Sequence, residues 1–172
     1  MSNNTQIPIR RHNTLRHPAA DYSDPGAYFI TLCTLDRDPL FGEIINTEMH
    51  CNPFGAILWE VWKSLPTRYP QISIDTAIVM PDHFHGIIII HPAREVHEPP
   101  LQKPSRRNMS IPLVIGYLKM NTAKRINAMH NTPGIPIWQR NYFDKILCDD
   151  LDYDTISEYI LTNTHRWGID PD

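Results

Sequence analysis

The order of apolar patterns along this 172-residue chain predicts an α+β fold, a ferredoxin-like split βαβ sandwich. One observation is the spacing of apolar residues, which indicates segments in the order strand, helix, strand, strand, helix, strand, helix. The other is the run of four isoleucines at 87–90, which indicates a strand buried on both faces and central in an antiparallel sheet. Two helices would cover one face of this sheet, and a C-terminal helix would be added.

The first strand and the first helix are predicted within residues 28–70. Residues 28–35 alternate with β-branched and aromatic side chains, which is typical of a strand, and residues 41–45 add a short strand or hairpin arm. Apolar positions then repeat at helical spacing. Asn52, which is followed by proline, favours the start of this helix, and Pro66 and Pro70 bracket its predicted end.

The next two strands are separated by a proline-aspartate break. Residues 72–80 form the second strand, Pro81 and Asp82 interrupt it, and residues 83–91 resume as the third. Because the break is short, we expect the two strands to be antiparallel neighbours. The third strand would then be the central one.

The second half of the domain repeats the helix-strand-helix order. Residues 92–109 contain four prolines and mixed charge, and are predicted to form a mobile loop. Ser110 can cap a second long helix, and residues 137–148 give the fourth strand. A last helix follows, capped by Thr155 or by an upstream aspartate.

The chain length is that of one domain preceded by an arm. Residues 1–26 are a basic N-terminal arm without periodicity, and residues 27–172 form a single domain. No apolar run is long enough to cross a bilayer, and the polar N-terminus lacks the apolar segment of a signal peptide, so we expect a cytoplasmic protein that does not bind membranes. Three widely spaced cysteines without a CxxC pair are expected to be reduced thiols.

Charge is segregated along the chain. The formal net charge of −3 argues by itself against nucleic-acid binding, but no acidic residue occurs between 99 and 143. The basic residues of that segment and of the arm favour a polyanion-binding surface, with solvated faces that bind nothing as the alternative. They are Arg10, Arg11, Arg16, Lys103, Arg106, Arg107, Lys119, Lys124, Arg125 and Arg140. Acids instead gather in a separate group: Asp144, Asp149, Asp150, Asp152, Asp154 and Glu158.

Two histidines at the start of the third strand are candidate metal ligands. His83 and His85 are separated by one residue, so they lie on the same face of a strand. A pair alone is equally compatible with core or hydrogen-bonded surface histidines, and a metal site needs a third ligand. Asn163 in the last helical segment is a candidate, because its amide oxygen is a hard donor suited to Mg²⁺ or Mn²⁺.

A tyrosine lies near that third candidate ligand. Tyr159 precedes Asn163 by four residues, so on a helix the two side chains share a face. A phenol is a nucleophile only with help at neutral pH, and a divalent cation that polarises a phosphate provides such help. The structural alternative is an amphipathic tyrosine at the rim of the core.

Together these motifs resemble those of the single-tyrosine HUH transposases, and within them the REP-associated tyrosine transposases. Over most of the chain the motifs fall in the family's order, and the most specific are the segments 80–86 (MPDHFHG) and 138–142 (WQRNY). Two positions depart from the pattern. Relatives often have histidine where this chain has Lys145, and Asn-Pro where it has Asn163-Thr164.

The resemblance implies that residues 27–172 are a single HUH transposase-like catalytic domain that nicks and joins single-stranded DNA. His83 and His85, with Asn163 as the third ligand, would bind Mg²⁺ or Mn²⁺. Tyr159 would attack a phosphodiester, leaving a 5′-phosphotyrosine and a free 3′-hydroxyl. The DNA would be a hairpin with flanking single strand, and the protein would be nucleoid-associated in the cytoplasm.

The basic residues would then contact the sugar-phosphate backbone of the DNA. Trp138 or Phe84 is a candidate for stacking on an unpaired base, with burial in the core as the alternative. Two other functions stay open: a ferredoxin-like nucleic-acid-binding protein that has lost catalysis, and a phosphohydrolase that uses the histidine pair. A homodimer is also compatible with the sequence. The tyrosine helix must pack beside the histidine strand of its own chain or of a partner.

Overall fold

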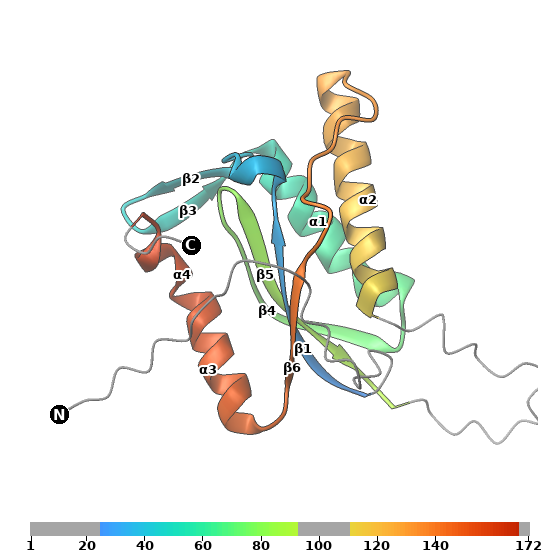
Figure 1. Ribbon diagram of the computed structural model, residues 1–172, viewed down its shortest axis with the longest axis vertical. Coiled ribbons are helices and arrows are strands. Elements are labelled where there is room, and N and C mark those ends of the chain that lie inside the picture. Colours follow the sequence, from blue (N-terminus) through green and yellow to red (C-terminus); the bar gives the residue numbers. More distant parts are fainter. Residues whose placement is uncertain (1–24, 93–110, 169–172) are drawn as a thin grey trace, which may run out of the picture.

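A four-stranded antiparallel sheet forms the centre of the protein, in the order β4-β5-β1-β6. The computed structural model describes residues 25–92 and 111–168. Two helices cover one face of the sheet and a third lies on the other face (Figure 1). The predicted α+β, ferredoxin-like split βαβ sandwich is confirmed. Its elements are β1 (Gly26–Cys33), α1 (Pro53–Arg68), β4 (Ile72–Val79), β5 (His83–Ile90), α2 (Ile111–His130), β6 (Phe143–Leu147) and α3 (Asp150–Leu161).

Three smaller elements complete the described part of the chain. The 3-10 turn η1 (Leu35–Arg37) follows β1, and the hairpin of β2 (Gly42–Ile45) and β3 (Glu48–Cys51) stands apart from the main sheet. This hairpin is the arm that the sequence predicted at 41–45. The short helix α4 (Asn163–Arg166) follows α3 and reaches the neighbourhood of β3 (Figure 1).

Helix α1 begins and ends where the sequence predicted. The Asn52 side chain accepts hydrogen bonds from the backbone N–H groups of Phe54 and Gly55, at 2.9 and 3.1 Å, and so caps the helix. The predicted end between Pro66 and Pro70 is confirmed, because α1 ends at Arg68. A proline in the last turn removes only one backbone hydrogen bond, whereas Tyr69, which precedes Pro70, leaves the helical conformation.

The last strand is shorter than predicted. Of the expected strand 137–148, only Phe143–Leu147 joins the sheet as β6, and Trp138 makes a single isolated bridge to Thr34. The Lys119 ammonium donates to the carbonyl oxygens of residues 139, 140 and 141, at 2.6, 3.2 and 3.4 Å. These carbonyls bond a side chain in place of a neighbouring strand, so the segment runs beside the sheet without pairing along it.

The upstream aspartate, and not Thr155, caps the C-terminal helix. Asp149 Oδ1 accepts a hydrogen bond from the Asp152 backbone N–H at 2.8 Å, while Thr155 donates to the Leu151 carbonyl inside α3. Ser110, the predicted cap of α2, lies outside the described residues, as do nearly all of the predicted arm 1–26 and loop 92–109. Those assignments stay predictions.

Strand β5 separates two cores by simple alternation. Phe84, Ile88 and Ile90 pack into the core under α1 and α2, while Ile87 packs into the smaller core under α3. β5 lies between β4 and β1, so its predicted central position is confirmed. Since side chains alternate with period two, a slip of one residue would exchange the contents of the two cores.

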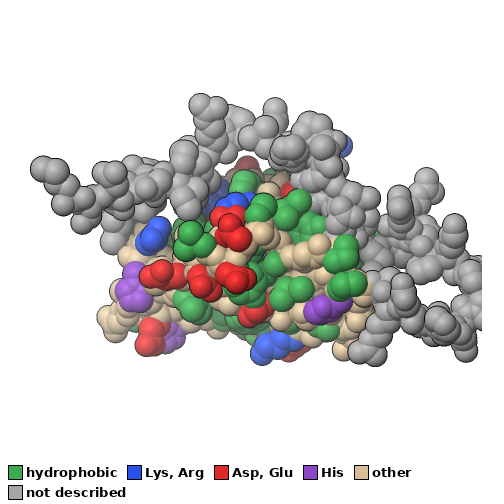
Figure 2. Space-filling view, turned by 90° about the horizontal axis from the view of Figure 1, so that it is seen from below, with side chains coloured by type: hydrophobic (Ala, Val, Ile, Leu, Met, Phe, Trp, Pro, Cys, Tyr) green, Lys and Arg blue, Asp and Glu red, His purple; other side chains and the backbone are tan. Residues whose placement is uncertain are grey.

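Acidic side chains gather on the end of the molecule where α3 begins, which is the face seen in Figure 2. Asp149, Asp150 and Asp154 are exposed there. The predicted acidic surface is therefore present. Among the described helices, none is both long and apolar enough to cross a membrane.

Gly86 is required for close packing between β5 and α1, which yields a stability prediction. A Cβ at this position would lie 2.8 and 2.9 Å from two ring carbons of Trp62, a residue that is 1% exposed and cannot retreat. We expect Gly86→Ala to lower the free energy of unfolding by about 1–3 kcal/mol in urea denaturation.

Gly116→Ala is the matched control, because a Cβ at this exposed site in α2 meets nothing within 4 Å. It should leave stability unchanged or raise it by up to about 1 kcal/mol, since alanine is the better helix former. Equal stability of the two variants would contradict the packing described for Gly86.

A candidate active site between β5 and α3

The two histidines of β5 lie side by side on the face of the sheet that carries α3. His83 and His85 are 3% and 4% exposed, and their ring centroids are 4.6 Å apart. Their partners on β1 are Cys33 and Thr31 respectively, and opposed residues of neighbouring strands point to the same face. The predicted two-histidine face is thus formed, next to a thiol and a hydroxyl.

Helix α3 brings a tyrosine to this pair. Ile156 and Ile160 anchor the helix on Phe29 and Ile87 of the sheet. Tyr159, which is half-buried, then lies with its ring centroid 5.3 Å from that of His85. Tyrosine and histidines meet within one chain, which is the first of the two arrangements left open by the sequence.

Tyr142, another tyrosine near the site in the sequence, packs against the core under α1 and α2. It therefore belongs to the opposite side of the sheet from the histidine pair. Among these two tyrosines, the structure brings only Tyr159 to the site.

Asn163 reaches the site from just beyond α3. The helix ends at Leu161, and Asn163 is the first residue of α4, so it does not continue the Tyr159 helix as the sequence predicted. The link between the two helices still forms one turn, because the Thr162 backbone N–H donates to the Glu158 carbonyl at 2.9 Å. Asn163 is 6% exposed, and its Oδ1 lies 3.3 Å from His83 Nε2.

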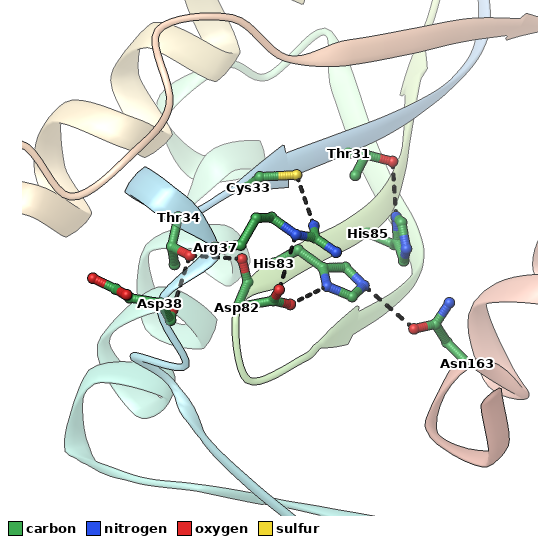
Figure 3. Close-up of polar contacts among 9 residues, drawn as sticks. All are labelled: Thr31, Cys33, Thr34, Arg37, Asp38, Asp82, His83, His85 and Asn163. Carbon is green, nitrogen blue, oxygen red and sulfur yellow. Dashed lines mark hydrogen bonds and ion pairs between the residues drawn. The ribbon is translucent and has the colours of Figure 1, made fainter. Parts of the chain in front are cut away.

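Both imidazole rings are held through their Nδ1 atoms (Figure 3). His83 Nδ1 lies 2.6 Å from Asp82 Oδ1, and His85 Nδ1 lies 2.8 Å from Thr31 Oγ1. His85 Nε2 is buried and has no hydrogen-bond partner within the described structure. Burial, followed by electrostatic interactions with the His83 ring and with Arg37, lowers the pKa of His85 well below its ordinary value, so this ring is neutral at neutral pH.

Three residues at the site were not singled out from the sequence. Asp82 is 5% exposed and binds both His83 and Arg37, whose Nε lies 2.9 Å from Asp82 Oδ2. The exposed Arg166 places its guanidinium carbon 5.5 Å from the centroid of the Tyr159 ring. The sequence could have indicated two of these residues by spacing, because Asp82 adjoins His83 and Arg166 lies seven residues after Tyr159. No pattern in the sequence indicates Arg37.

The predicted DNA-binding residues are dispersed. Lys124 and Arg140 are exposed, and Arg125 forms an ion pair with Glu60. Lys119 is half-buried on the carbonyls of residues 139–141, and burial lowers its pKa. The remaining ones lie outside the described residues: Arg10, Arg11, Arg16, Arg106 and Arg107.

The two candidate stacking aromatics are core residues. Trp138 is 7% exposed and packs on Phe41, with ring centroids 5.2 Å apart. Phe84 is fully buried and packs on Trp62 at 4.9 Å. The alternative considered for both, burial in the core, is the one that the structure shows.

No group of three histidine, cysteine, aspartate or glutamate side chains that could hold a metal occurs within residues 25–92 and 111–168. The potential donors at the site are instead two imidazole nitrogens and one amide oxygen, from His83, His85 and Asn163. The amide oxygen is a donor that hard cations such as Mg²⁺ prefer, whereas imidazole nitrogens also bind softer transition metals.

The fold that holds this site is also found in a solved structure. A REP-associated tyrosine transposase bound to a REP hairpin superposes with a TM-score of 0.59 at 17% identity, over 95% of this chain and 75% of that one. The chain thus has the fold of that transposase. A putative transposase from Deinococcus radiodurans is a weaker match, with a TM-score of 0.48 at 17% identity over 80% of this chain and 90% of that one.

Sequence comparison places the chain in a family. It is 34% identical over 174 residues to an uncharacterized protein of Haemophilus influenzae, covering 97% of this chain and 94% of that protein. The chain belongs to the same family as this Haemophilus protein. No family model matches it.

Two side-chain contacts fix α3 on the sheet. Lys145 of β6 bonds Asp152 at 2.8 Å, and this hydrogen bond holds the pKa of Asp152 below its ordinary value. The Tyr153 hydroxyl donates to Asp75 of β4, and burial together with this bond raises the pKa of Tyr153 to about 12. Lys145 thus joins β6 to the helix that carries Tyr159.

The Tyr153 contact predicts a pH dependence of stability. Its folded pKa exceeds the ordinary value of about 10, so the contact stabilises the fold fully below pH 10 and is lost as the pH rises towards 12. We expect the free energy of unfolding to fall more steeply between pH 10 and 12 in the wild type than in Tyr153→Phe. Parallel curves would contradict this contact, and Asp75→Asn should reduce the difference.

Proposed function

We propose that this protein is a metal-dependent enzyme that nicks and joins single-stranded DNA through a covalent tyrosine intermediate. The observation that carries the proposal is the meeting of Tyr159 with His85 and of Asn163 with His83, residues about 80 positions apart in the sequence. A nucleophile and three potential metal ligands therefore converge on one face of the sheet. The transposase fold supports the same class of reaction.

The proposed reaction is a transesterification by Tyr159. Its phenolic oxygen forms a bond to phosphorus, and the bond from phosphorus to the 3′-oxygen of the preceding nucleotide breaks. The products are a 5′-phosphotyrosine and a 3′-hydroxyl, which takes up the equivalent of the proton that the phenol loses. Because the phosphodiester is conserved, attack by a 3′-hydroxyl reverses the step and joins strands without a nucleotide triphosphate.

The donors at the site fit a Mg²⁺ or Mn²⁺ ion. His85 Nε2 is buried without a hydrogen-bond partner in the described part of the chain, although buried polar atoms are normally paired. His83 Nε2 faces the amide oxygen of Asn163. We assign these three residues as ligands. When bound, the cation would supply positive charge that polarises the phosphate under attack.

Arg166 would assist the nucleophile. Its guanidinium lies over the Tyr159 ring, and its side chain is exposed and accessible to a phosphate. A guanidinium there stabilises both an ionised phenol and the phosphate oxygens. His85 in turn stays neutral because burial lowers its pKa, so it keeps the lone pair that a ligand needs.

The proposed substrate is a DNA hairpin with flanking single strand. The transposase that shares this fold was solved with a REP hairpin. Contacts to the backbone would come from the basic residues Arg10, Arg11, Arg16, Arg106, Arg107, Lys119, Lys124, Arg125 and Arg140. The acidic side chains at the start of α3 would repel the DNA phosphates (Figure 2). The DNA would therefore not reach Tyr159 across that end of the helix.

The first test is the covalent adduct. Incubation with Mn²⁺ and a labelled hairpin that carries single-stranded flanks should give a protein-DNA species that survives SDS. Tyr159→Phe should lower its yield by at least about 100-fold, because the nucleophilic oxygen is absent.

Tyr153→Phe on the same helix is the control, and it should retain the adduct since its hydroxyl bonds Asp75 on another strand. An undiminished adduct in Tyr159→Phe would rule out this nucleophile. A wild type that binds the hairpin but forms no adduct would indicate a nucleic-acid-binding protein that has lost catalysis.

The second test concerns the metal. His85→Ala removes a ring nitrogen from the site and should weaken Mn²⁺ binding by at least about 10-fold in calorimetry. The control is His91→Ala, because His91 is exposed beyond the end of β5 and bonds Ser73. Equal Mn²⁺ affinities of the two variants would contradict the ligand assignment, and EDTA should abolish the adduct of the wild type.

A further inference from the structure

We infer that Asp82 is a positioning residue that fixes which nitrogen of His83 carries the proton. Arg37 in turn fixes which oxygen of the Asp82 carboxylate faces His83. The three side chains form one connected row that ends at Asn163 (Figure 3). The inference concerns the metal-free protein directly. It rests on the proposed function only for its consequence in catalysis.

The two oxygens of Asp82 have different partners. Oδ2 accepts from Arg37 Nε at 2.9 Å, and Oδ1 lies 2.6 Å from His83 Nδ1. An ionised carboxylate only accepts hydrogen bonds, so Nδ1 is the donor. A neutral imidazole has a single N–H, so in the neutral form of His83 this geometry leaves the lone pair on Nε2.

This tautomer has a consequence at Asn163. The lone pair of His83 Nε2 and the Oδ1 of Asn163 are both acceptors, and they lie 3.3 Å apart in a buried place. Two acceptors at this distance do not satisfy each other, whereas a shared cation satisfies both. In the other tautomer, Nε2 would donate its proton to Asn163, and the lone pair needed by a ligand would be absent.

The carboxylate is held in place from the backbone as well. The Asp82 carbonyl accepts hydrogen bonds from both the N–H and the hydroxyl of Thr34, each at 2.9 Å. Arg37 has φ of 61°, in the left-handed region, and also donates to Cys33 Sγ at 3.0 Å. The turn after β1 thus presents its guanidinium to Asp82 from a fixed position.

The variant Asp82→Asn distinguishes this positioning role from a purely structural Arg37–Asp82 ion pair, because asparagine keeps the shape of the side chain. The single oxygen of the new amide is held by the Arg37 guanidinium, so its NH₂ group faces His83 Nδ1 as a donor. Nδ1 must then accept, and the proton moves to Nε2. In Arg37→Ala/Asp82→Asn the amide oxygen is free to turn to Nδ1, which restores the original tautomer.

The experiment is long-range ¹H–¹⁵N NMR of histidine-labelled, metal-free protein at about pH 8, combined with Mn²⁺ titration. We expect protonated Nδ1 of His83 in the wild type, protonated Nε2 in Asp82→Asn, and protonated Nδ1 again in the double variant. Mn²⁺ affinity should fall about 10- to 100-fold in Asp82→Asn and recover in the double variant. Asp75→Asn, an equivalent change on β4, should alter neither quantity.

A wild type with protonated Nε2 would overturn the inference without any variant. So would Asp82→Asn with unchanged tautomer and Mn²⁺ affinity, while a double variant that keeps protonated Nε2 would overturn the role of Arg37. If the predicted tautomers and affinities are found but the wild type forms no DNA adduct, the proposed function fails and the positioning role stands.

Discussion

The packing of α3 on the outer face of β1 and β5 is the interaction on which the site depends. Ile156 and Ile160 bury against Phe29 and Ile87, and this small apolar cluster fixes the helix that carries Tyr159. The larger core under α1 and α2 holds the sheet itself. Because one strand, β5, contributes to both, the register that buries Phe84 on one face also presents the histidines on the other.

The site face buries polar groups that a simple core would avoid. Asp82, His83, His85 and Asn163 are each less than 7% exposed, and buried polar atoms cost stability unless they are bonded. Asp82 is fully bonded through Arg37 and His83. His85 Nε2 has no hydrogen-bond partner within the described residues, and a buried unpaired atom is where a ligand gains most.

Several charged residues have structural roles that composition does not reveal. Asp149 caps α3, and the acids of its first turn favour the positive end of the helix dipole, so the acidic surface helps to form the tyrosine helix. Lys119 holds the carbonyls of residues 139–141, and Lys145 joins β6 to α3. The segregation of charge along the sequence therefore overestimates how many basic side chains are accessible to a polyanion.

The sequence by itself determined the order of elements, the sandwich, the central place of β5 and the shared face of His83 and His85, because these follow from local periodicity. It also indicated the pairing of Tyr159 with Asn163 through their spacing. Only the tertiary structure decided that 139–141 leave the sheet and that Arg37 reaches Asp82. Such contacts join segments remote in sequence, and they depend on how helices and turns pack across the sheet, which no local pattern encodes.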